Sequence, residues 1–145
     1  MQVYCNWYFK LDRWAFFRLF FHLSHPRSPL STPYLLKGAF FCRNYPMERV
    51  NDLFQKLPTY ESLSWPSSMI SRFVNVPRVL EAVGGGQNVL LIAGGEDRLM
   101  EPPIVRKAAK EYGAAYEEVK GSGHHVMLDL FWEDAVVKIV QYVSR

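Results

Sequence analysis

Two short stretches of this sequence carry side chains that could do acid–base chemistry. Residues 121–129 read GSGHHVMLD and place His124 and His125 directly behind a glycine-rich loop, while Asp97 follows an apolar stretch further upstream. A carboxylate that accepts a hydrogen bond from one ring nitrogen of a histidine fixes its tautomer and stabilises the imidazolium, so the other nitrogen can act as a base. We therefore expect Asp97 and His124 to form such a pair, with His125 as a packing neighbour.

The elements that must bring this pair together are an alternation of strands and helices. The apolar run at 88–93 is typical of a strand buried on both faces of a parallel sheet. Pro102 and Pro103 predict the start of a helix that ends at Gly113, and 116–120 is a weaker strand candidate. Because ligands bind beyond the carboxyl ends of parallel strands, the loops after both strands should open on one rim.

A final helix is predicted after the histidine loop. Its buried side is expected to hold a set of apolar residues at helical spacing: Trp132, Ala135, Val136, Ile139, Val140 and Val143.

Punctuation by proline and glycine divides the chain into three regions. Residues 1–25 are predicted as an apolar N-terminal helix, 26–86 as a helical cap-like region, and 87–145 as an α/β core unit. Within the cap-like region, residues 46–57 carry apolar side chains at the spacing of a buried helix face: Val50, Leu53, Phe54 and Leu57. Candidate residues of an apolar substrate pocket follow in the same region: Trp65, Met69 and Phe73.

Composition narrows the function classes. The chain has 145 residues and a net charge of +3 without a continuous basic stripe, which argues against a nucleic-acid partner. Two cysteines give neither a metal spacing nor a disulfide framework, and they favour a reduced, cytoplasmic location. The apolar residues 14–23 include Arg18 and are shorter than the roughly 20 residues of a membrane-spanning helix. A packed helix is the favoured interpretation, and contact with a membrane surface is the alternative.

The stretches VLLIAGGEDRLM and VKGSGHHVMLD together resemble the C-terminal part of the α/β-hydrolase family. In that family the acid of the catalytic triad follows the penultimate strand and the histidine lies in a glycine loop after the last strand. The resemblance implies that Asp97 is the acid and His124 the base. The upstream stretches PRSPLSTPYLLKGAFF and YPMERVNDLFQKLPTYESLSWPSSMISRFVNV resemble the helical cap of a group of these hydrolases common among fungi.

The chain departs from the family at the nucleophile. A hydrolase of this kind carries its nucleophile on a strand-to-helix turn within Gly-x-Ser-x-Gly, and this sequence has no such motif. Ser122 belongs to the histidine loop and is not expected to be the nucleophile. We therefore expect the chain to be the C-terminal portion of an esterase-like hydrolase and to be inactive alone. A truncated product, an alternative start or a gene-model error would each give such a chain. A serine nucleophile would favour acyl chemistry and an aspartate epoxide hydrolysis.

Other functions are weighed against the hydrolase interpretation. A metal site built from His124, His125 and Asp129 is disfavoured, since adjacent histidines rarely share one ion. The glycines after the first strand lack the remainder of a dinucleotide or phosphate-loop motif, so we expect no cofactor. The stronger alternative is a non-catalytic protein that binds a small apolar ligand, self-associates, or pairs with a complete homologue.

Overall fold

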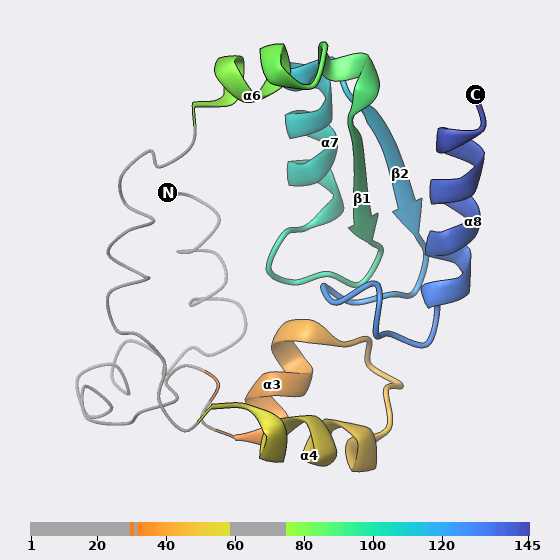
Figure 1. Ribbon diagram of the computed structural model, residues 1–145. Coiled ribbons are helices and arrows are strands. Elements are labelled where there is room, and N and C mark those ends of the chain that lie inside the picture. Colours follow the sequence, from red (N-terminus) through yellow and green to blue (C-terminus); the bar gives the residue numbers. More distant parts are fainter. Residues whose placement is uncertain (1–29, 31, 59–74) are drawn as a thin grey trace.

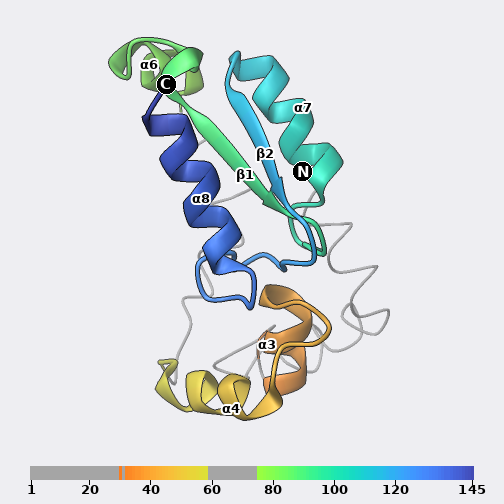
Figure 2. The same cartoon turned by 90° about the vertical axis from the view of Figure 1, so that its right-hand side faces the viewer.

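The computed structural model describes residues 30, 32–58 and 75–145, which form a mixed α/β structure around a small parallel sheet. Helices α7 and α8 lie on opposite sides of this sheet, and α3 and α4 lie beyond one end of it (Figure 1, Figure 2). The elements in chain order are α3 (Pro33–Phe40), α4 (Met47–Lys56), α6 (Val76–Ala82), the 3-10 helix η1 (Gly86–Asn88), β1 (Leu90–Gly94), α7 (Pro102–Tyr112), β2 (Ala115–Val119) and α8 (Trp132–Val143).

The sheet consists of β1 and β2 in parallel, paired from Leu90 opposite Ala115 to Gly94 opposite Val119. A parallel pair needs a crossover connection, and α7 provides it. This helix begins with prolines in its first turn and ends at Gly113, whose φ of 62° is the left-handed conformation that glycine adopts readily. The predicted strands and crossover helix are thus confirmed to within two residues at their ends.

Helices α3 and α4 pack against each other beyond the carboxyl ends of both strands (Figure 1). Thr32 caps α3 by accepting a hydrogen bond from the amide of Leu35 at 3.2 Å. The buried cluster between the two helices comprises Leu36, Phe41, Cys42, Tyr45 and Val50. The predicted face of α4 is confirmed, because Val50 is fully buried and Leu53, Phe54 and Leu57 pack against this cluster.

The burial predicted for α8 and β1 is wrong in part. Only Ala135 of the expected α8 face is buried, and the exposed remainder consists of Trp132, Val136, Ile139, Val140 and Val143. The described sheet has two strands of five residues each, which is too narrow to cover an apolar stripe along a helix of twelve. For the same reason the first three residues of β1 are half-buried, whereas Ala93 and Gly94 are buried.

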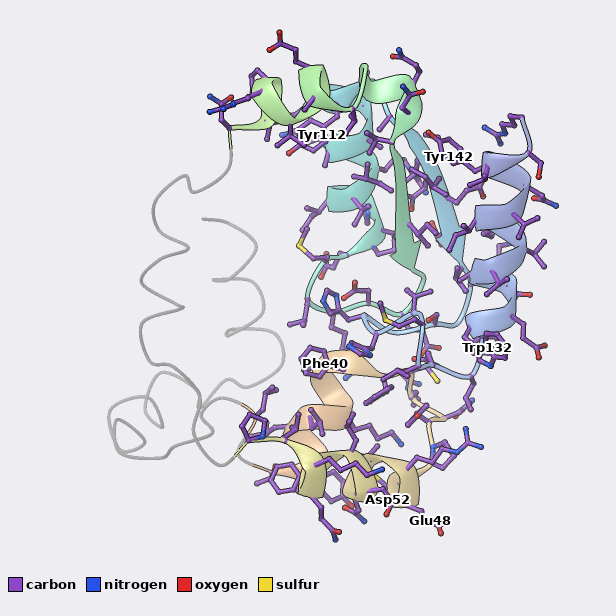
Figure 3. All side chains as sticks on the ribbon, in the orientation of Figure 1. Phe40, Glu48, Asp52, Tyr112, Trp132 and Tyr142 are labelled. Atoms are coloured by element: carbon purple, nitrogen blue, oxygen red, sulfur yellow. The ribbon has the colours of Figure 1, made fainter. Side chains whose placement is uncertain are left out.

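Polar contacts hold α8 against the sheet where apolar cover is thin. The ammonium of Lys138 lies 2.8 Å from the carboxylate of Glu117 in β2. The hydroxyl of Tyr142 donates a hydrogen bond of 2.7 Å to the carbonyl of Gln87 in η1, at the end of the sheet remote from α3 (Figure 3). The orientation of α8 is therefore set at points along its length as well as by Ala135.

At the opposite end of the sheet, Gly94 touches the backbone of the histidine loop. A methyl group in place of the Gly94 hydrogen would overlap the carbonyl oxygen of Gly123 and approach that of Ser122 to 2.6 Å. Both atoms belong to the backbone, so neither can move aside as a flexible side chain would. The close approach of the loops after β1 and β2 therefore depends on glycine at this position.

We expect Gly94→Ala to lower the free energy of unfolding by about 1–3 kcal/mol, because the new methyl group must displace the loop that carries His124. Gly38→Ala is the matched control: a methyl group there meets no atom within 4 Å, and glycine inside a helix is less favourable than alanine by about 0.5–1 kcal/mol. Urea unfolding followed by circular dichroism measures both. Equal stabilities for the two variants would contradict the close approach.

Candidate active site

Asp97, the expected acid, lies in a tight loop directly after β1. Asp97 is 7% exposed, and its Oδ1 accepts hydrogen bonds from the amides of Leu99 at 2.8 Å and Met100 at 2.9 Å. The amide of Glu96 donates to the carbonyl of Ser122 at 2.7 Å, which fastens this loop to the one after β2. Asp97 therefore accepts hydrogen bonds within its own turn and is not an exposed surface charge.

His124, the expected base, lies in the loop after β2 and contacts Asp97. Nδ1 of His124 is 2.8 Å from Oδ2 of Asp97, and the side chains are 34% and 4% exposed respectively. The expectation that these residues are neighbours in space is confirmed. Because both oxygens of a carboxylate accept hydrogen bonds, the geometry favours the tautomer in which Nδ1 carries the proton. Nε2 then has its lone pair available to accept a proton.

Phe40, at the C-terminal end of α3, forms one wall beside the pair. Its ring is stacked on that of His124, with centroids 5.9 Å apart and planes inclined by 28°. Figure 3 shows Phe40 directed from α3 toward the loops at the carboxyl ends of the strands. This contact gives the imidazole an apolar neighbour from a part of the chain remote in sequence.

His125 packs between aromatic rings, as expected for a neighbour. Its ring centroid lies 5.6 Å from that of Phe40 and 6.1 Å from that of Phe41, and its amide donates to the carbonyl of Phe40 at 2.8 Å. The buried Nδ1 has no hydrogen-bond partner among the described residues. Burial lowers the pKa of His125 from its ordinary value of 6.5, and the neighbouring His124 lowers it further.

Asp129 is a polar residue of this site whose role the sequence did not disclose. It is 1% exposed, and its Oδ2 accepts hydrogen bonds from the amides of Cys42 at 2.8 Å and Gly123 at 2.9 Å, while Oδ1 accepts from Leu130 at 2.6 Å. Backbone amides therefore use three of the roughly four acceptor positions of this carboxylate. A single carboxylate inside the apolar run VMLDLF was the available signal, because buried charges require such partners.

Cys42 and Ser122 are buried polar groups beside the pair. Burial raises the pKa of the Cys42 thiol to about 11, and its hydrogen bond to Asp129 contributes in the same direction. The hydroxyl of Ser122 is fully buried and donates to the carbonyl of Gly123 at 3.3 Å. Neither group is an ionised or accessible nucleophile in this arrangement.

Several sequence-based predictions fall on residues that are not described. The proposed pocket residues Trp65, Met69 and Phe73, and the whole N-terminal region 1–25, lie outside the described residues. Within the ranges that are described, no group of three or more His, Cys, Asp and Glu side chains is arranged to hold a metal ion. The helices in those ranges are also too short or too polar to cross a membrane.

Known proteins provide no template for this site. The chain matched no protein-family model, no curated protein and no solved structure. The resemblance of its acid and base motifs to a hydrolase therefore stays a prediction, and the chemistry must be argued from the contacts of Asp97 and His124 themselves.

Asp97→Asn is expected to reverse the tautomer of His124. The amide oxygen can replace Oδ1 toward Leu99 and Met100, which leaves the amide nitrogen facing Nδ1 and forces Nδ1 to accept. The proton then lies on Nε2, as 15N chemical shifts of the ring nitrogens will report. Asp97→Ala also loses the hydrogen bonds to the turn. Each charged hydrogen bond that is lost should lower the free energy of unfolding by up to about 1.5–3 kcal/mol. Unchanged ring shifts in Asp97→Asn would contradict the pairing.

We expect His125 to make the free energy of unfolding depend on pH. Its pKa in the folded chain is below 6.5, so the unfolded chain binds more protons in the interval between the two values. Stability is full above pH 6.5 and falls as the pH decreases through this interval. His125→Phe should remove that component and flatten the dependence, without loss of a partner at Nδ1. Urea titrations of both proteins from pH 7.5 to about 4.5 measure the difference; parallel curves would contradict it.

Proposed function

We propose that this chain supplies the acid and base of an ester hydrolase of the α/β-hydrolase type. The observation that carries the proposal is the contact of 2.8 Å between Nδ1 of His124 and Oδ2 of Asp97, made at the carboxyl ends of adjacent parallel strands. In open parallel sheets this edge is where ligands bind. The α3–α4 pair beyond that edge is positioned as a cap would be, which supports a cap-like role for this part of the predicted region 26–86 beside the core unit at 87–145 (Figure 1). Helix α6, which the predicted cap-like region also includes, lies at the other end of the sheet.

In this function His124 is the general base and Asp97 the residue that orients it. Nε2 removes the proton from an attacking hydroxyl as its oxygen bonds to the acyl carbon, and the imidazolium then returns the proton to the departing alkoxide. The carboxylate of Asp97 stabilises the positive ring between the two transfers. The Phe40 ring beside the imidazole favours an apolar acyl group.

The nucleophile must come from outside the pair. The sequence contains no Gly-x-Ser-x-Gly, and Ser122 is fully buried. The described sheet is narrow and the apolar face of α8 is exposed, which favours the presence of further strands beside the two described. A nucleophile would lie on one of these further strands. Without it, water is the attacking group and turnover is slow.

A fluorophosphonate probe and an activated ester test these roles. We expect no stoichiometric labelling of the chain, together with slow hydrolysis of p-nitrophenyl acetate that depends on His124. His124→Gln should reduce this rate on the order of tenfold, below the 10²–10⁴-fold effect of a base that acts on a positioned nucleophile. His125→Phe is the matched control and should retain the rate. Equal rates for His124→Gln and the parent would contradict the role of His124 as a base. A labelled serine would contradict the claim that the chain lacks a nucleophile.

A non-catalytic interaction protein is the second candidate, favoured by the exposed apolar face of α8. Val136, Ile139 and Val140 are 45%, 44% and 56% exposed, and their spacing places them on one face of the helix. A second copy of the chain could cover this face with the same residues of its own α8, as symmetric dimers do. This function needs no turnover, so the ester assay distinguishes it from the first.

We expect the parent chain to self-associate and Val140→Lys to weaken that association by at least about tenfold, since burial of a valine contributes about 1.5 kcal/mol or more. Gln141→Lys adds the same charge at the next, exposed position of α8 and should leave the association unchanged. Sedimentation velocity over a series of concentrations provides the measurement. A parent chain that stays monomeric throughout would contradict this candidate.

A further inference from the structure

The turn that follows α3 contacts both catalytic loops through consecutive amides. The amide of Cys42 donates to Oδ2 of Asp129 at 2.8 Å, and the amide of Arg43 donates to Oε2 of Glu96 at 2.9 Å. Asp129 belongs to the loop that carries His124, and Glu96 directly precedes Asp97. Each loop therefore extends a carboxylate to the same short piece of backbone, across sequence separations of 87 and 53 residues.

His124 is held on both sides by residues 40–42. On its N-terminal side, Gly123 donates its amide to the same Oδ2 of Asp129 that accepts from Cys42, at 2.9 Å. On its C-terminal side, the amide of His125 donates to the carbonyl of Phe40 at 2.8 Å. The backbone on either side of the base is thus linked to the end of α3, while the ring itself is stacked on Phe40.

Burial strengthens the contacts of Asp129 and Gly123. Asp129 is 1% exposed, so its charge depends on the amides that it binds, and those amides would lose their acceptor if the carboxylate were removed. Gly123 has no room for a side chain because a methyl group there would lie 2.5 Å from the carbonyl carbon of Phe41. The loop and the turn are therefore in backbone contact, with Asp129 as the link between them.

We propose that Asp129 is a positioning residue for His124, and that residues 40–43 anchor the acid loop and the base loop against each other. This inference rests on the proposed function, because Asp129 does not contact the reacting atoms and affects the reaction only by positioning His124. It makes the α3–α4 region part of the support of the base, in addition to any role as a cover of the site.

The test compares Asp129→Asn with Asp134→Asn, which makes the same chemical change at an exposed residue of α8. In Asp129→Asn the amide oxygen can still serve Cys42 and Gly123, but its nitrogen faces the amide of Leu130, another donor. We expect the low-field resonance of the His124 Nδ1 proton to broaden or vanish and the ester hydrolysis rate to fall on the order of tenfold, while the fold is retained. Asp134→Asn should match the parent in both.

The thiol of Cys42 supplies an independent readout. In a Cys5→Ser background, the reaction of the Cys42 thiol with a thiol reagent at pH 8 should be slow in the parent. In Asp129→Asn it should be on the order of tenfold faster, because the thiol loses one hydrogen bond to a charged group. Glu96→Gln removes a charge from the exposed contact to Arg43 and should change the thiol reaction much less. A folded Asp129→Asn protein with an unchanged His124 resonance and unchanged thiol reactivity would overturn the inference.

Amide exchange in the parent covers the case in which Asp129→Asn fails to fold. The amides of Cys42, Gly123 and His125 should exchange with one common opening free energy, because they belong to one connected set of contacts. Independent opening of these amides would overturn the inference. A parent that shows the His124 resonance and common exchange but no His124-dependent hydrolysis would reject the proposed function and leave the positioning role of Asp129 intact.

Discussion

The site depends on the parallel pairing of β1 with β2. Since both strands run in one direction, their carboxyl ends meet at the same edge, and Gly94 and Val119 are directly paired there. The loops that follow these paired residues therefore begin side by side. An antiparallel pair would have placed Asp97 and His124 at opposite ends of the sheet. The hydrogen bond between them is therefore a consequence of strand direction as much as of the residues that make it.

Side-by-side loops need backbone that can approach backbone, and glycine provides it. Gly94 faces the carbonyls of the histidine loop, and Gly123 faces the turn after α3, so three segments meet without intervening side chains. Gly121, at a φ of +79°, turns the chain between β2 and this contact. Polar side chains then close the gaps: Asp97 accepts from its own turn, and Asp129 accepts from two neighbouring segments.

The parts of this structure that the sequence predicted are those with local signals. Pro102 at the start of α7, the left-handed Gly113 at its end and the apolar run of β1 each mark an element by their own conformational preferences. The pairing of Asp97 with His124 followed once the strands were taken as parallel. The contacts of Asp129 with Cys42 join residues distant in sequence, and no spacing rule specifies them. The exposure of α8 was missed because burial depends on how many strands lie beneath a helix, which the pattern on the helix itself does not contain.

The contacts that position the candidate base are therefore independent of the apolar packing of the sheet. Asp97, Ser122 and Asp129 are at most 7% exposed, whereas Trp132 and Val143 of α8 are 48% and 74% exposed. The charged hydrogen bonds that link the loops to the end of α3 are strong where water is excluded, and they do not require a wide sheet. Additional strands beside β1 would bury more apolar surface and add stability, but the geometry of Asp97 and His124 is already determined by contacts within the described residues.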